Sequence, residues 1–117
     1  MYAYEIPNLR FSLPAGGAVA HRRFVSVSGD KAIQATGSTP VVGASMNEVT
    51  ATELAAGERI VEVADGIVMV EAAGTIASGV LVYADATGKA TATGTTNAAG
   101  IAITAAAAGE LLAVKIN

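Results

Sequence analysis

The fold class is decided by the stretch Ala56-Gly57-Glu58-Arg59-Ile60-Val61-Glu62-Val63-Ala64-Asp65-Gly66-Ile67-Val68-Met69-Val70-Glu71-Ala72. Two runs rich in β-branched residues flank Asp65-Gly66, and an Asp-Gly pair readily supplies the two positive φ values of a type I′ turn. The stretch therefore predicts a β-hairpin. The valines of each run point to one face, and Glu62 and Glu71 lie on the mixed faces, as expected for a sheet packed on one side and partly wet on the other.

Short apolar or alternating runs, separated by Gly turns, occupy the chain on both sides of this stretch. The predicted strands cover residues 24–28, 32–35, 41–44, 80–84, 90–93, 101–104 and 111–116. Residues 46–54 fit either a short helical turn or a strand, and the alanine run 105–108 is too short to nucleate a helix, so a wide turn is expected there. The series predicts an all-β fold, a small antiparallel β-sandwich or barrel.

The N-terminal residues differ in composition from the rest of the chain. Residues 1–14 hold two of the three Tyr, one of the two Phe and two of the three Pro. This density of aromatic residues and proline is more typical of an extended arm than of a strand in a closed sheet. We therefore predict an N-terminal arm, 1–14, and a single β domain, 15–117. The arm is expected to lie across the domain, a neighbouring subunit or a partner.

Composition limits the classes of function. The 117 residues are 52% hydrophobic, but much of this is Ala, with two Phe and no Trp, so the core is expected to be thin and to gain from self-association. The net charge of −3 disfavours nucleic-acid binding. Without Cys there is no disulfide or thiolate metal site, and no cofactor is expected. No signal peptide and no membrane-length apolar run is recognised, so a soluble protein without membrane contact is expected.

The sequence repeats one pattern. Ala56-Gly57-Glu58 precedes the run 59–63, and Ala108-Gly109-Glu110 precedes the run 111–115. In both places a turn glycine and a glutamate come before a predicted strand. The favoured interpretation is one type of turn used twice, with a duplicated module as the alternative.

Few residues indicate a catalytic, metal-binding or partner-binding role. His21 is the only histidine, and beside Arg22-Arg23 it is interpreted as part of a basic surface trio that can meet an acidic partner. Glu58, Glu62 and Glu71 are interpreted as charges on a solvated face, with acid–base catalysis as the weaker alternative. Lys89 in its Gly-containing turn lacks the flanking residues that mark a biotinyl or lipoyl carrier. No catalytic or metal site is predicted, and the protein is not expected to be an enzyme.

The C-terminal half resembles the small phage capsid decoration or cement proteins. The resemblance rests on three stretches and covers roughly residues 54–117. These stretches are Ala56-Gly57-Glu58-Arg59-Ile60-Val61-Glu62-Val63, Ala73-Gly74-Thr75-Ile76-Ala77-Ser78-Gly79-Val80-Leu81-Val82-Tyr83, and Gly100-Ile101-Ala102-Ile103-Thr104-Ala105-Ala106-Ala107-Ala108-Gly109-Glu110-Leu111-Leu112-Ala113-Val114-Lys115-Ile116. The first 14 residues match nothing in that family.

The resemblance implies a structural protein that binds the outside of an icosahedral head after expansion. It implies trimers at local threefold positions that clamp neighbouring major capsid subunits, and a location on the virion after synthesis in the host cytoplasm. The expected contacts with capsid or sibling subunits come from the arm and the basic trio: Tyr2, Tyr4, Ile6, Leu9, Phe11, His21, Arg22 and Arg23. The alternative function is a carbohydrate- or receptor-binding β module of a phage or cell surface, for which exposed aromatic residues are few.

Overall fold

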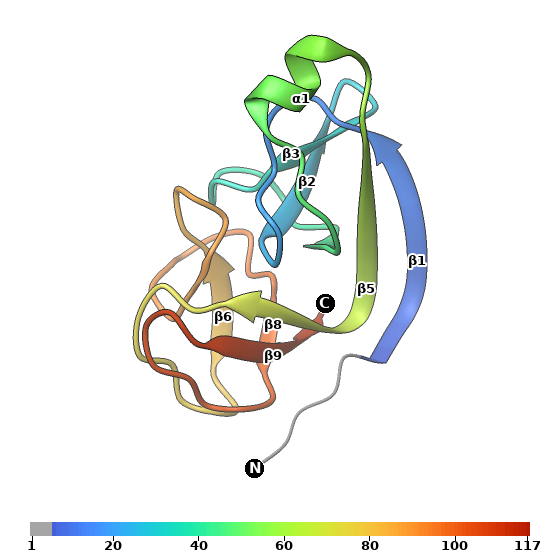
Figure 1. Cartoon of the computed structure of the whole chain (residues 1–117). Coiled ribbons are helices and arrows are strands. Elements are labelled where there is room, and N and C mark those ends of the chain that lie inside the picture. The colour runs from blue at the N-terminus through green and yellow to red at the C-terminus, as the bar shows by residue number, and fades with distance from the viewer. Residues whose placement is uncertain (1–5) are drawn as a thin grey trace.

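The computed structural model describes residues 6–117, with side chains described from Leu9 onward. Its elements are β1 (Ile6–Pro14), β2 (Phe24–Ser28), β3 (Lys31–Gln34), β4 (Gly43–Ser45), α1 (Ala51–Ala56), β5 (Ile60–Glu71), β6 (Leu81–Ala84), β7 (Ala90–Thr91), β8 (Gly100–Ala102) and β9 (Leu111–Ile116). The strands pair in the order β3-β2-β4-β5-β9-β8-β6-β7. β1 pairs with β5 and lies alongside it in Figure 1. Every pairing between these strands is antiparallel, which confirms the predicted all-β class.

Residues 46–54, which fit either a helical turn or a strand, lead into the short helix α1. Thr50 begins the helix: its hydroxyl accepts a hydrogen bond from the Glu53 amide at 3.1 Å, and the Glu53 carboxylate accepts one from the Thr50 amide at 3.0 Å. This reciprocal capping box satisfies two donors that a short helix would otherwise leave unpaired. The alanine run 105–108 is a loop with one bridging residue, Ala106, as the sequence predicts.

The predicted hairpin at Asp65-Gly66 is wrong, because β5 runs through this pair as one strand. Gly66 has a φ of 105°, but Asp65 is not among the residues with positive φ, so the two positive values that a type I′ turn requires are not both present. The Asp65 carboxylate instead accepts a hydrogen bond from the Gly66 amide at 2.8 Å. In Figure 1, β5 runs alongside β1 and then turns sharply to run alongside β9.

A continuous β5 changes which side chains share a face. In a hairpin closed at Asp65-Gly66, Val63 and Val68 would lie on one face; in a continuous strand, residues five apart lie on opposite faces. Val61 and Val63 pack into one buried cluster, and Val68 and Val70 pack into another. β5 is therefore shared by two cores, one on each of its faces.

The N-terminal segment is a strand, which corrects the expectation of an arm outside the sheet. From Ile6 to Pro14 it pairs with β5, with an irregularity between Pro7 and Leu9. Phe11 and Leu13 are half-buried against the cluster that contains Val61 and Val63. The aromatic and apolar residues that suggested an arm are explained by this packing, since they cover a face of β5.

The strand pairings repeat along the chain. β1 pairs with the first half of β5 as the second half of β5 pairs with β9, and β2 pairs with β4 as β6 pairs with β8. The pair Phe24↔Ala44 is matched 57 residues later by Leu81↔Ile101. The bridge Val19↔Val49 is matched at the same offset by Ile76↔Ala106. The chain thus consists of two structural copies of one unit: a first repeat from β1 to the first half of β5, and a second repeat from the second half of β5 to β9.

The helix accounts for the one large difference in length between the repeats. Ala44↔Ala64 in the first repeat corresponds to Ile101↔Lys115 in the second, so the offset is 57 residues before α1 and 51 after it. The difference equals the six residues of α1. In the second repeat a turn takes its place, where the Glu110 carboxylate accepts a hydrogen bond from the Ala107 amide as Glu53 does from Thr50. The chain does contain a duplicated unit, but the Ala-Gly-Glu pattern does not mark it, because Glu110 corresponds to Glu53 and not to Glu58. The interpretation as one turn type used twice is also wrong, since φ is 158° at Gly57 and 85° at Gly109.

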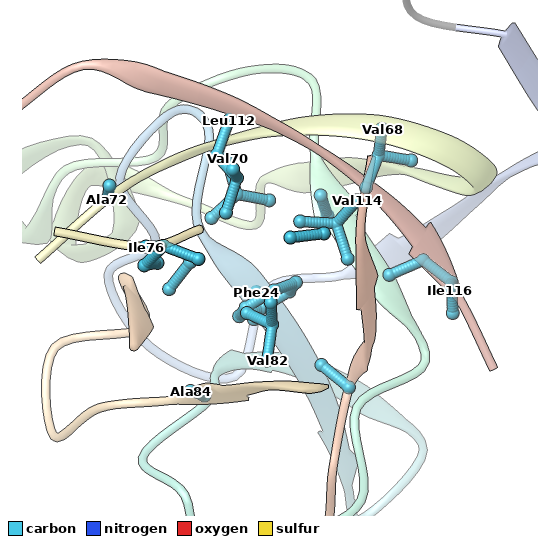
Figure 2. Packing of buried hydrophobic residues seen from close by; sticks show 14 of the residues in the cluster. Phe24, Val68, Val70, Ala72, Ile76, Val82, Ala84, Leu112, Val114 and Ile116 are labelled. Atoms are coloured by element: carbon cyan, nitrogen blue, oxygen red, sulfur yellow. The ribbon is translucent and has the colours of Figure 1, made fainter. Parts of the chain in front are cut away.

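Each repeat has its own core. The first core consists of Ala15, Val19, Val25, Ala32, Val49, Val61 and Val63. The second core contains the equivalent residues of the second repeat, including Ala72, Ile76, Val82, Ala106, Leu112 and Val114. It also takes in Phe24, Ala44 and Ala64 from the opposite face of the first repeat. Figure 2 shows Phe24 among Ile76, Val82 and Val114, so the second repeat is built against the first.

Candidate partner-binding surfaces

The outward face of the second repeat is rich in exposed apolar side chains. Cross-strand register places Leu81 beside Ile101, and Ile101 beside Lys115. The next positions along the same face are Ile103, whose amide donates to the Ala113 carbonyl, and Met69, which is the register partner of Ala113. Leu81, Ile101, Ile103, Leu111, Met69 and Lys115 are hereafter called the β6–β8–β9–β5 face. Its apolar members other than half-buried Met69 are between 42% and 50% exposed.

A hollow of about 610 Å³ opens on this face. It is lined by Met69, Ser78, Ile103, Thr104, Ala105, Glu110 and Leu111. The only charged side chain among these is Glu110, whose carboxylate already accepts the Ala107 amide at 2.7 Å. The walls are mixed, with Met69, Ile103 and Leu111 as apolar members and the Ser78 and Thr104 hydroxyls beside one engaged carboxylate. A single carboxylate that is already hydrogen-bonded suits contact with a partner better than it suits acid–base chemistry.

The basic trio is only partly directed outward. His21 is exposed, and Arg22 is half-buried with a φ of 60°. Arg23 is engaged inside the molecule: its guanidinium donates to the Glu71 carboxylate at 3.3 Å and to the Thr87 carbonyl at 3.2 Å. Lys89 pairs with the same carboxylate at 3.1 Å. Arg23 thus joins the start of β2 to the end of β5 and to the turn before β7.

This network perturbs the titration of Glu71. The hydrogen bond from Lys89 lowers the pKa of the Glu71 carboxyl below its ordinary value; burial opposes the shift, and Arg23 reinforces it. The carboxylate is the favoured form because two cations face it. Glu71 is therefore a structural charge that ties the two repeats together.

Glu62 and Glu71 are not brought together on one face. Glu62 and Glu71 lie on opposite faces of β5, which corrects the expectation that the two share one wet face. Glu62 accepts a hydrogen bond from the Ser12 hydroxyl at 2.8 Å, and Glu58 is exposed. Among the residues from 6 to 117, no group of three His, Asp or Glu side chains is placed to hold a metal ion.

The predicted contact residues of the N-terminal segment separate into three groups. Tyr2 and Tyr4 lie outside the described residues, and Ile6 is described only as the first residue of β1. Leu9 is 56% exposed, whereas Phe11 is half-buried against the first core. Of the described members, Leu9 is thus the apolar side chain most open to a partner.

Sequence reasoning missed the β6–β8–β9–β5 face. Its residues come from separate short strands, and single exposed aliphatic residues carry no signal of their own. The similarity between the repeats offered a usable signal. When residues 15–20 are aligned with residues 72–77, Leu81 takes the position of the buried Phe24.

The part of the chain that the structure describes contains no helix long and apolar enough to cross a membrane.

The fold is shared with a protein of a phage head. The structure superposes on the N base of the head fiber gp8.5 of bacteriophage phi29 with a TM-score of 0.71 and 19% sequence identity, covering 93% of this chain and 95% of that one. At this level of identity the similarity concerns the fold. No curated protein matches the sequence.

The sequence itself supplies the family. The family model described as phage cement protein matches residues 5–116, which is nearly the whole chain, and the chain belongs to this family. Both repeats lie within the match, so the resemblance first seen in the C-terminal half extends to the N-terminal half. The family assigns the protein a structural role in the phage head and a place on the virion.

Proposed function

We propose that the protein binds the outer surface of the mature head at positions between capsomers, as a homotrimer, and holds neighbouring major capsid subunits together. The family match across residues 5–116 is the observation that carries this proposal. A thin, alanine-rich pair of cores, an open apolar face and carboxylates engaged in structural contacts are consistent with a binding role for the protein.

Repeated weak contacts suit this role. A trimer presents each contact three times, so modest individual interfaces give durable attachment through avidity. The net charge of −3 supplies no general attraction to nucleic acid, so recognition is directed to protein on the shell.

The proposed capsid contacts belong to the N-terminal segment and to the basic trio. They comprise Tyr2, Tyr4, Ile6, Leu9 and Phe11, together with His21, Arg22 and Arg23. Of the described members, Leu9 and His21 have the exposure that a contact residue needs. Because Arg23 holds Glu71, its contribution to attachment is expected to be indirect, through the position of the β2 start.

The test uses purified protein and heads of the cognate phage that lack it. Mixed with expanded heads, the protein should co-sediment at a saturable copy number and raise the temperature at which the packaged DNA is released. Unexpanded heads serve as the control and should bind much less. Absence of saturable binding to expanded heads contradicts the proposal.

A further inference from the structure

The two repeats differ in what covers one equivalent face. In the first repeat, Phe24, Ala44 and Ala64 form a row across β2, β4 and β5, as the register shows. All three side chains are fully buried, because the second repeat packs over them. This row is the surface of the first repeat against which the second repeat packs.

The same row in the second repeat lies open. Its members are Leu81, Ile101 and Lys115, which the equivalent register places across β6, β8 and β9. Leu81 is 50% exposed and Ile101 is 43% exposed. The residues at these two positions are as apolar as those that are buried in the first repeat, although no unit packs over them within residues 6–117.

Neighbouring side chains extend the open row into a patch. Ile103 and Leu111 are also exposed, and Met69 lines the hollow together with them. The patch carries one cation, Lys115, whose long aliphatic stem can lie along apolar surface while its amine reaches water. Contiguous exposed apolar surface of this kind marks a site of interaction.

We propose that the β6–β8–β9–β5 face binds a second copy of this chain. The occupant is inferred from the internal interface, because within the chain the equivalent face is already covered by a unit of the same fold. A contact between this face and a different surface of the next copy is heterologous, and such contacts close into a ring when the rotation allows. The inference deepens the proposed function and rests on its homotrimer, for which it supplies the interface.

The charge and composition of the face disfavour the other occupants. A glycan would be expected to stack on aromatic rings, and the face offers none, although Ser78, Thr104 and Glu110 line its hollow. A nucleic acid would need more than the single cation Lys115. An apolar protein surface is the remaining match.

The experiment measures the mass of the purified protein in solution, without heads, by light scattering. The wild type should have a mass at least twice that of the single 11.6 kDa chain. Ile101→Glu should weaken self-association about 100-fold and give single chains, since a carboxylate would be buried without a partner. Ile60→Glu is the matched control, because Ile60 is 44% exposed and occupies the position in the first repeat that corresponds to Leu111 in the second. Ile60→Glu should leave the mass unchanged.

A second measurement covers the case in which Ile101→Glu fails to fold. The chain contains no Cys, so a single cysteine can be introduced and its modification by a maleimide followed. Ile101→Cys should react slowly at protein concentrations where the oligomer forms and quickly on dilution, whereas Ile60→Cys should react quickly throughout.

Two results would overturn the inference: a single-chain mass for the wild type at high concentration, or equal behaviour of the variants at positions 101 and 60. Binding to heads is scored separately. An oligomer that requires Ile101 but does not bind expanded heads would contradict the proposed function and leave this interface standing.

Discussion

Gly43 and Gly100 occupy equivalent places in the two repeats, and each permits a backbone approach that a side chain would block. A Cβ at Gly43 would overlap the Ala64 carbonyl oxygen, and a Cβ at Gly100 would overlap the Lys115 carbonyl oxygen. Gly43 lies where β4 passes close to β5, and Gly100 lies where β8 passes close to β9. The duplication therefore preserves a steric requirement as well as a pairing pattern.

Substitution of either glycine by alanine should destabilise the protein. Because the overlapping atoms belong to the backbone and cannot rotate away, we expect each variant to lose about 2–4 kcal/mol of unfolding free energy. Denaturant unfolding followed by circular dichroism checks this. Gly17→Ala is the control, since a Cβ there meets nothing within 4 Å. Equal stability of Gly17→Ala, Gly43→Ala and Gly100→Ala would contradict the close approach.

Because of Glu71, the free energy of unfolding should depend on pH in the acidic range. Its folded-state pKa lies below the ordinary value of 4.5, so its contribution is present above that pH and is lost as pH falls through the folded-state pKa. Glu71→Gln should therefore cost about 0.5–1 kcal/mol at pH 7, and the difference from wild type should shrink below pH 4.5. Unfolding free energies measured from pH 7 to pH 3 test this, with the exposed Glu58→Gln as control. A difference that does not change with pH would contradict the pairing with Lys89 and Arg23.

Among the elements, β5 is the one whose structure the sequence predicts only in part. Its β-branched alternation correctly predicts extended structure on both sides of Asp65-Gly66. The alternation alone does not distinguish a reversal of the chain from a bend, because both leave the valines alternating within each run. What decides between them is long-range: β1 pairs along the first half of β5 and β9 along the second, and those partners replace the hairpin contacts.

β1 is expected to be required for folding. Deleting residues 2–13 would remove the strand that pairs with β5 and would expose the face of the first core that Phe11 and Leu13 cover. We expect this variant to lose cooperative thermal unfolding, whereas deletion of residues 2–5 should keep it. Calorimetry of the two truncated proteins distinguishes these outcomes. Cooperative unfolding of the longer deletion at the wild-type temperature would mean that β1 is dispensable.

For the molecule as a whole, composition and turn spacing were enough to predict the class of fold, whereas the family role came from the resemblance of stretches within residues 54–117 to the cement proteins. The all-β class and most strands follow from local alternation between Gly turns, and β2 has the predicted bounds 24–28. The duplication was only the less favoured alternative from the sequence, because the two repeats match in register and burial far more than in residue identity. The open apolar face follows from the duplication and could not be recognised before it.

The duplication also explains why a chain with so few large side chains folds at all. Much of the second core is alanine, and it is completed by Phe24 from the first repeat, so the second repeat uses the first as part of its packing. Within residues 6–117 the equivalent face of the second repeat stays open, and a further copy of the chain or the shell beneath is where burial can continue. The proposed self-association and the proposed attachment to the head would both complete this packing.

The most direct test is a cryo-electron microscopy reconstruction of expanded heads saturated with the purified protein. The predicted result is density for the described fold on the outer surface, between capsomers, in groups of three, with the β6–β8–β9–β5 face of each copy turned toward a sibling. Bare heads, or density confined to the interior or to a single vertex, would contradict the assignment of this protein as a stabiliser of the shell.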